Sequence, residues 1–311
     1  MSQNIQYTNV IVFGPAGDVG GLVALEAHKH GAQVWLAMRD TTKSIPADVE
    51  KSGNFARVQA DLVDPPSVTK ALAESGAKAA FLYVSRAALQ ALHDSGVENI
   101  VLLSGAVVKG EGAALREIPS TAGNAFKHAQ CEIAVEDLGF PYFTALRPSW
   151  FASNYLKFAL NRWSKPMKAQ IPVEDAYFDN VAPEDIGAVG GTALVGLPQA
   201  GLLSKGKTTL YLYGREWRTV KENWELIKKV TGRDDIDTTP MAPETFVQTL
   251  TTYGLPEAEA RFLVAAQERA RTRIPQAEHD VGIANVRKYL GREPMSFVEY
   301  LEAHKAEWKS L

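Results

Sequence analysis

The first half of the chain alternates between continuous apolar runs and longer segments with apolar residues every three or four positions. The apolar runs predict strands at 8–13, 33–38, 55–59, 79–84, 99–104 and 142–147. The segments between them predict helices at 19–29, 66–75, 86–95 and 124–138. Continuous apolar strands that alternate with helices are typical of a parallel sheet covered on both faces. The pattern therefore predicts an α/β fold with a doubly wound parallel sheet.

The pattern changes after residue 148. Residues 149–180 are aromatic and irregular, and a helix at 183–195 and a strand at 208–213 then return to the sheet. The rest is mostly helical, with runs near 219–231, 243–253, 256–270 and 296–308. We expect a dinucleotide-binding (Rossmann) domain formed by 1–150 and about 181–215, and a smaller, mostly helical substrate lobe formed by about 151–180 and 216–311. The segment 160–177 has few periodic signals and predicts a mobile flap.

The first predicted strand runs directly into three glycines with the spacing G-x-x-G-x-x-G, and a helix pattern follows. Glycines let the backbone approach a pyrophosphate, and a helix N-terminus offers free N–H groups and a partial positive charge. This loop predicts a dinucleotide site, and its cofactor-binding residues are Gly14, Ala16, Gly17, Asp18, Val19 and Gly20. The alternative is a glycine turn that only packs a helix against a sheet.

The end of the second strand bears on the choice of cofactor. Arg39 stands where an NAD site usually has an acidic residue, and a guanidinium suits a 2′-phosphate. Asp40 would repel that phosphate only if it pointed inward, and Lys43 could add a second positive charge. The sequence favours NADPH or NADP over NADH, and the alternative is a solvated arginine at a strand end.

The ends of the other strands supply the remaining candidate cofactor contacts. Asp61 can accept a hydrogen bond from the adenine amino group, and Leu62 can cover the ring face. Val84 and Ser85 should line the ribose or pyrophosphate side. Ser104 should lie beside the nicotinamide, and Pro148 closes the sixth strand at the same edge.

Composition and charge exclude several classes of protein. The chain has 311 residues, a formal net charge of −3 and 46% hydrophobic residues, so no basic footprint points to nucleic acid. No apolar run is long enough for a membrane span, and the short polar start leaves no room for a signal peptide. The single cysteine, Cys131, is expected to be buried and suits a reducing compartment, so we expect a cytoplasmic protein. The spacing of the histidines indicates no metal site.

Four stretches resemble the NmrA-like branch of the atypical short-chain dehydrogenases. They are residues 14–20, 97–104, 128–154 and 178–187. That branch includes NADPH quinone reductases, isoflavone and phenylcoumaran ether reductases, and NADP-sensing regulators. The resemblance implies the Rossmann fold and an NADP cofactor, and it implies the reaction only loosely because the family contains enzymes and non-enzymes.

The usual Tyr-x-x-x-Lys pair of short-chain dehydrogenases is absent. Gly123 and Asn124 stand where the tyrosine would precede Lys127 or His128. His128 falls where ether-reductase relatives carry their active-site lysine and quinone-reductase relatives carry a histidine.

We therefore expect His128, with Ser104 and Glu132, to form the catalytic set. His128 could donate a proton to the substrate or bind the ribose, and Glu132, one helical turn away, could orient it or raise its pKa. The alternative is that His128 contacts the cofactor without a chemical role, and Lys127 is expected to face solvent.

Bulky side chains follow the sixth strand and indicate a flat, apolar substrate. The candidate substrate contacts are Trp150, Phe151, Asn154, Tyr155 and Phe158. For Trp150 and Phe158, a place in the core between the lobes is the alternative. The leading hypothesis is an NADPH-dependent reductase of a quinone, an enone or an aromatic intermediate of secondary metabolism, acting as a monomer or homodimer. A non-enzymatic NADP(H)-sensing regulator and a non-redox isomerase or cyclase on the same scaffold stay open.

Overall fold

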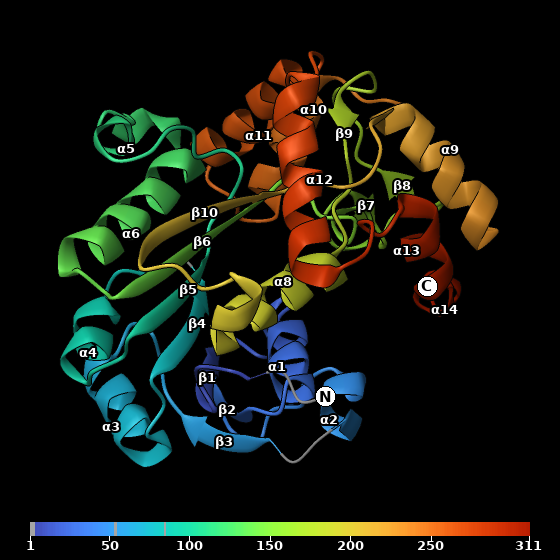
Figure 1. Cartoon of the computed structure of the whole chain (residues 1–311). Coiled ribbons are helices and arrows are strands. Elements are labelled where there is room, and N and C mark those ends of the chain that lie inside the picture. Colours follow the sequence, from blue (N-terminus) through green and yellow to red (C-terminus); the bar gives the residue numbers. More distant parts are fainter. Residues whose placement is uncertain (1–3, 53–54, 84) are drawn as a thin grey trace. The chain divides into compact units, whose positions relative to one another are not determined.

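The computed structural model describes residues 4–52, 55–83 and 85–311 (Figure 1). Contacts within the chain divide it into two units, which are described one at a time. The first comprises Met1–Pro148, Pro183–Leu212 and Asn285–Arg292. The second comprises Ser149–Ala182, Tyr213–Ala284 and Glu293–Leu311. The sequence-based division differs from this one at 285–292, which it assigned to the substrate lobe.

The first unit is built on a seven-stranded parallel sheet with the order β10-β6-β5-β4-β1-β2-β3. The strands are β1 (Asn9–Phe13), β2 (Gln33–Met38), β3 (Ala56–Gln59), β4 (Ala79–Tyr83), β5 (Asn99–Leu103), β6 (Tyr142–Pro148) and β10 (Gly206–Leu212). The order runs outward from β1 in both directions, which is the doubly wound arrangement. The predicted fold class is confirmed.

Helices cover both faces of this sheet (Figure 1). One face carries α1 (Gly20–Lys29) and α8 (Pro183–Val195), and the other carries α3 (Pro65–Ser75), α4 (Leu89–Asp94) and α6 (Asn124–Leu138). The sequence did not predict the short helices α2 (Ala47–Ser52) and α5 (Ala113–Arg116) or the 3₁₀ turns η1 (Ser120–Ala122) and η2 (Pro198–Ala200).

One core cluster of this unit lies between the sheet and the helices α3, α4 and α6. It includes Phe13, Leu82 and Leu102 from the strands and Val135 from α6. Cys131 belongs to this core, and burial raises the pKa of its thiol to about 11. The prediction that this cysteine packs as a small apolar residue is confirmed.

The parallel register brings the carboxyl ends of the strands to one edge. Phe13 pairs with Ala37, Tyr83 with Leu103, and Pro148 with Leu212. The loops that follow these strands therefore begin side by side, which is where doubly wound sheets bind their ligands.

The second unit is mostly helical. Its helices are α7 (Asn154–Lys157), α9 (Val220–Thr231), α10 (Pro243–Thr252), α11 (Glu257–Arg269), α13 (Phe297–Ala303), α14 (Lys305–Lys309) and the first part of α12 (Gln276–Leu290). Two small antiparallel pairs join β7 (Leu160–Asn161) to β8 (Lys168–Ala169) and β9 (Tyr177–Phe178) to β11 (Arg218–Thr219). Its core is rich in large aromatic side chains, among them Tyr155, Trp224 and Trp308.

Three expectations about this unit are corrected. The segment 160–177 is not a loose flap, since Leu160, Ile171 and Val173 are buried in the core. Helix α12 was missed altogether. The single helix expected at 296–308 is broken at His304, where α13 ends and α14 starts.

No helix in the described parts of the chain is long and apolar enough to cross a membrane. Among the same residues, no group of three or more His, Cys, Asp or Glu side chains is arranged to hold a metal ion.

Candidate active site

The glycine loop between β1 and α1 is a tight turn whose glycines have different functions. Gly14 adopts a φ of +70°, and the N–H of Gly17 donates to its carbonyl oxygen at 3.1 Å. A Cβ on Gly20 would lie 2.3 Å from that oxygen, so only glycine fits there. A Cβ on Gly17 would meet only the oxygen of Gly14, at the ordinary distance of 3.4 Å. Glycine at 14 and 20 therefore serves the turn itself, whereas the open side of Gly17 leaves room for a ligand.

The other residues of the loop differ in their exposure to solvent. Ala16 is exposed, Asp18 is half-buried, and Val19 is buried in front of α1. Helix α1 begins at Gly20, and the residue before it, Val19, makes no side-chain capping hydrogen bond. A helix N-terminus behind a glycine turn is a suitable seat for an anion such as a pyrophosphate.

The end of β2 presents an exposed guanidinium. Arg39 and Lys43 are both exposed. The Asp40 carboxylate turns into its own loop, where it accepts hydrogen bonds from the backbone N–H and the hydroxyl of Thr42 at 2.9 and 2.6 Å. These bonds lower the pKa of Asp40. The Asp40 carboxylate is thus engaged by Thr42 within its own loop.

A hydrogen bond joins the loop that follows β3 to the loop that follows β4. The Ser85 hydroxyl donates to the carbonyl oxygen of Leu62 at 3.2 Å, and Asp61 accepts from the N–H of Val63. The Leu62 side chain is buried in the core, whereas Val63 is 73% exposed. Val63 is therefore the apolar side chain that this corner offers to a ligand, and the sequence did not single it out. Val84 lies outside the described residues.

His128 lies beside the residue that follows Ser104, just beyond the end of β5. A Cβ on Gly105, which follows Ser104, would lie 3.7 Å from Nε2 of His128 on α6. The His128 Nδ1 is buried and has no hydrogen-bond partner among the described side chains and backbone. Burial lowers the pKa of His128, and the opposing attraction of Glu132 is smaller. The imidazole is therefore neutral near pH 7 and has one N–H to donate. Lys127 is exposed, as expected.

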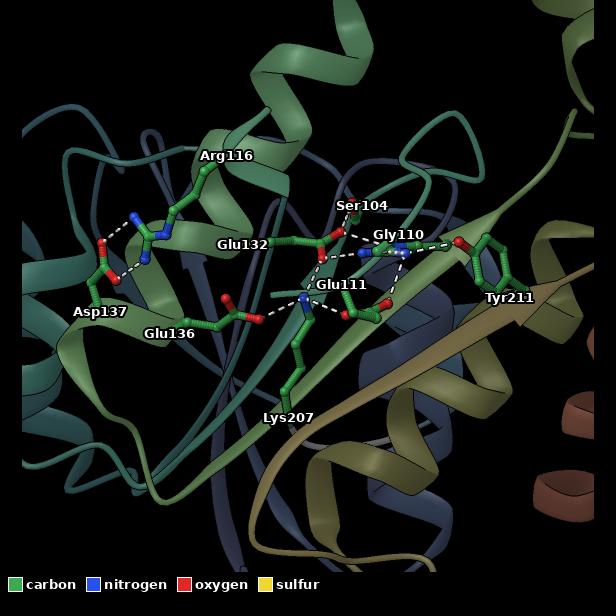
Figure 2. A network of polar contacts seen from close by, with 10 residues as sticks. Ser104, Gly110, Glu111, Arg116, Glu132, Glu136, Asp137, Lys207 and Tyr211 are labelled. Carbon is green, nitrogen blue, oxygen red and sulfur yellow. Dashed lines mark hydrogen bonds and ion pairs between the residues drawn. The ribbon is translucent and has the colours of Figure 1, made fainter. Parts of the chain in front are cut away.

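Glu132 lies at the centre of a buried ion pair beneath Ser104 (Figure 2). Its carboxylate and the Arg147 guanidinium are both 0% exposed. Arg147 Nη2 lies 2.6 Å from Oε2 and Nε lies 3.0 Å from Oε1, which is the two-pronged geometry of a strong pair. Ser104 Oγ donates to Oε1 at 2.6 Å. No hydrogen bond from His128 to this carboxylate occurs in the described structure, so Glu132 orients Ser104 rather than His128.

The ion pair extends outward to four further side chains, Glu111, Glu136, Lys207 and Tyr211. Lys207 of β10 lies within 2.9 Å of carboxylate oxygens of Glu111, Glu132 and Glu136. Arg147 also donates to the Tyr211 hydroxyl at 2.8 Å. Figure 2 shows Lys207 between these carboxylates, below Glu132.

The cations determine the charge state of this network. Burial raises the pKa of Glu132, but the hydrogen bonds and charge of Arg147 outweigh it, so the net pKa is below the ordinary value. Burial lowers the pKa of Lys207, but its carboxylate partners outweigh that effect and raise it. Glu132, Arg147 and Lys207 therefore all stay charged near neutral pH.

The model of the NmrA-like family matches residues 6–301 of this chain. The chain belongs to the NmrA-like family. It is 32% identical over 314 residues to the Nitrogen metabolite regulation-like protein bik4 of Gibberella fujikuroi, an alignment that covers 95% of this chain and 96% of that protein. The family resemblance stated from the four sequence stretches is thus confirmed.

Solved structures with the fold of this NmrA-like protein include two reductases. One is the NADPH-dependent quinone oxidoreductase of Escherichia coli in complex with NADPH, with a TM-score of 0.68, 21% identity, and coverage of 94% of this chain and 99% of that chain. The other is the triphenylmethane reductase of Citrobacter sp., with a TM-score of 0.68, 17% identity, and coverage of 96% and 99%. At these identities the similarity shows the fold.

The candidate substrate residues of this NmrA-like protein lie in its second unit. Trp150 stacks on Phe178 with ring centroids 4.4 Å apart and packs against the core of that unit. Phe158 is 69% exposed, so it is not a core residue. Trp150 therefore packs within the second unit, whereas Phe158 leaves most of its side chain exposed.

The other three candidates differ in accessibility. Tyr155 is 1% exposed, and its hydroxyl accepts from Asn223 at 2.8 Å. Phe151 and Asn154 are half-buried. Of the five, Phe151, Asn154 and Phe158 retain surface with which to contact a ligand, whereas Tyr155 belongs to the core.

Sequence reasoning missed Arg147 and Lys207. The signal for Arg147 was present, because a charged residue inside a continuous apolar strand must have a partner when it is buried. Its partner could not be named, since Glu132 lies on the preceding helix and only the fold brings the two together. Lys207, 60 residues after Arg147 in the sequence, pairs with the same carboxylate. Tyr83 was also missed. It is 47% exposed, and its ring lies 2.9 Å from where a Cβ on Gly14 would be.

Proposed function

We propose that this protein is an NADPH-dependent reductase of a flat, electrophilic small molecule such as a quinone or an enone. The observation that carries the proposal is the turn from Gly14 to Gly20. It is closed against side chains at Gly20 but open at Gly17, and it leads into a helix whose N-cap residue, Val19, makes no capping hydrogen bond. This combination suits a pyrophosphate that approaches the backbone directly.

The choice of NADPH rests on the end of β2. An exposed guanidinium can pair with two oxygens of a 2′-phosphate, and the neighbouring Asp40 carboxylate is already engaged by Thr42. The solved relatives named as NADPH-dependent quinone oxidoreductase and triphenylmethane reductase support the same cofactor and reaction class.

The reaction needs a hydride and a proton, and bound NADPH would supply the hydride from its nicotinamide. The protein's contribution is at the acceptor oxygen, which gains electron density as the hydride arrives. The His128 N–H can donate a hydrogen bond to that oxygen, and a neutral imidazole suffices because a quinone is already electrophilic. The proton that completes the reduced oxygen then comes from His128 or from water.

A second candidate function is an NADP(H)-sensing regulator. It is favoured by Gly123 and Asn124, which replace the tyrosine of the usual acid pair, and by the regulatory name of the Gibberella fujikuroi relative. In that case the same loop and Arg39 would bind the nucleotide without turnover.

One experiment separates these functions. Thermal unfolding is followed with NADPH, NADP⁺, NADH and NAD⁺ in parallel, and NADPH oxidation is then followed at 340 nm with a panel of small quinones and enones. A ligand at about a hundred times its Kd stabilises the folded protein by about 2.7 kcal/mol, which shifts the Tm of a chain of this size by several degrees.

A Tm shift with the phosphorylated nucleotides together with acceptor-dependent oxidation supports the reductase. A shift without turnover on any acceptor supports the regulator. No shift with any of the four nucleotides would refute both functions.

A further inference from the structure

The buried ion pair fixes the direction of one hydrogen bond. Ser104 Oγ lies 2.6 Å from Glu132 Oε1, and an ionised carboxylate can only accept. The hydroxyl has a single proton, and a bond this short to a charged acceptor is a strong one. Ser104 therefore donates its one O–H hydrogen bond to Glu132. Towards any further partner, its oxygen can only accept a hydrogen bond.

Arg147 keeps Glu132 ionised, so the direction of this hydrogen bond does not change. Its guanidinium contacts both oxygens of Glu132, and both side chains are 0% exposed. An uncharged Glu132 would leave the buried guanidinium with only the half-exposed carboxylate of Glu111, 2.9 Å from Nη1, as a counter-ion, which is costly. Lys207, 2.9 Å from Oε2, adds a second positive charge. The carboxylate therefore cannot take up a proton and donate it back to Ser104.

Ser104 closes β5 at the edge where the strand ends meet, and the next residue lies against His128. A nicotinamide seated at this edge presents a carboxamide with one donor, its NH₂, and one acceptor, its carbonyl oxygen. A free serine could pair with either group. A serine whose proton is already committed can pair only with the NH₂.

We propose that Glu132 and Arg147 are positioning residues that make the Ser104 hydroxyl an obligate acceptor for the carboxamide NH₂ of NADPH, and so fix the rotation of the nicotinamide ring beside His128. This rests on the proposed function, since it requires that NADPH binds at this edge. Glu132 then acts through Ser104 and not through His128.

The test compares two ligands by calorimetry. NADPH carries the nicotinamide, and 2′-phospho-ADP-ribose shares its remaining contacts but lacks that ring. We expect Ser104→Ala and Glu132→Gln each to weaken NADPH binding by up to about tenfold, the equivalent of one hydrogen bond, and to leave the binding of 2′-phospho-ADP-ribose within about twofold. The double variant should bind NADPH no more weakly than Ser104→Ala, because Glu132 acts through Ser104.

The matched control is Glu136→Gln. Glu136 contacts Lys207 but not Ser104, so this variant should bind NADPH as the wild type does.

A second probe needs no variant. Reduced 3-acetylpyridine adenine dinucleotide phosphate has a methyl ketone in place of the carboxamide and therefore no N–H. The wild-type protein should bind it about as weakly as Ser104→Ala binds NADPH, and Ser104→Ala should no longer distinguish the two. This arm remains decisive if Glu132→Gln does not fold.

The outcomes are distinguishable. Equal losses for NADPH and 2′-phospho-ADP-ribose, additive losses in the double variant, or equal wild-type affinity for NADPH and its acetyl analogue would each overturn the inference. Failure of the wild-type protein to bind either NADPH or 2′-phospho-ADP-ribose would instead refute the proposed function itself.

Discussion

At the scale of single residues, the protonation state of His128 decides how it can assist a reduction. Burial lowers the pKa of the ring more than Glu132 raises it, so the ring is neutral near pH 7. A neutral histidine assists by donating its one N–H, and its assistance does not decline as the pH rises from 7. An imidazolium acid would lose its proton over that range.

We therefore expect quinone reduction by the wild-type protein to show no His128-dependent loss of kcat between pH 7 and 8.5. His128→Ala should lower kcat by about a hundredfold and leave the Kd of NADPH within about twofold. Steady-state kinetics and nucleotide titration measure the two effects, with exposed Lys127→Ala as the control. A loss confined to the Kd would instead make His128 a ligand of the cofactor ribose.

Arg39 carries the preference between the two nicotinamide cofactors. Removing its guanidinium deletes charge-assisted hydrogen bonds to a 2′-phosphate, which contribute about 1.5–3 kcal/mol. Arg39→Ala should weaken NADPH binding by about ten- to a hundredfold and NADH binding by no more than about twofold. Arg116→Ala, at an exposed arginine paired with Asp137, changes the net charge equally and controls for it. Equal losses for both cofactors would remove Arg39 from the phosphate site.

At the scale of elements, substitutions at two glycines in the loop between β1 and α1 should have different effects, one on nucleotide binding and the other on stability. A valine at Gly17 meets no neighbour closer than 3.4 Å from its Cβ, whereas an alanine at Gly20 would lie 2.3 Å from the oxygen of Gly14. Gly17→Val should fold with nearly the wild-type Tm but bind neither NADPH nor NADH, because the side chain fills the place of the pyrophosphate. Gly20→Ala should lower the free energy of unfolding by about 1–3 kcal/mol. Retained nucleotide affinity in Gly17→Val would show that the phosphates bind elsewhere.

The sheet was predictable because most of its strands are largely apolar, and only the edge strands β3 and β10 are more polar. The predicted bounds of β2, α6 and α8 are those of the structure, and most other bounds in the first unit differ by one or two residues. The local pattern of apolar residues is enough to predict these elements, because the residues that each element buries follow one another at regular spacing in the sequence.

Helix α12 was missed for a physical reason. Its buried residues Ile283, Val286 and Tyr289 have helical spacing, but Gly282 interrupts the pattern. A Cβ at Gly282 would lie 2.1 Å from the Tyr213 ring, so the glycine serves a contact with a residue 69 positions earlier. Contacts between residues far apart in the sequence also limited the prediction of the candidate site. The glycine loop is one continuous segment and was predicted, whereas the network of Glu132, Arg147 and Lys207 joins three separate elements and was not.

At the scale of the whole molecule, two buried acids make opposite contributions to stability as the pH changes. The cations around Glu132 lower its pKa, so its contribution is present above the pKa of the unfolded chain and is lost on acidification. Asp179 is buried, and no cation is among the described groups that shift its pKa. Ser149 Oγ lies 2.6 and 2.7 Å from its oxygens, and the N–H of Gly214 donates at 2.7 Å. Burial outweighs these bonds and raises the pKa of Asp179 to about 7.

Asp179 should therefore make the folded protein less stable as the pH rises. With a raised pKa, the folded state holds a proton that the unfolded state has already released, so the free energy of unfolding falls between the ordinary value of 3.8 and about 7. We expect the free energy of unfolding of the wild type, measured by urea titration, to fall by up to roughly 2 kcal/mol relative to that of Asp179→Asn between pH 5 and 8. The difference between the two proteins isolates Asp179, since all other groups titrate in both. A difference that stays constant with pH would mean that the folded protein tolerates the Asp179 charge, with Ser149 and Gly214 satisfying it fully.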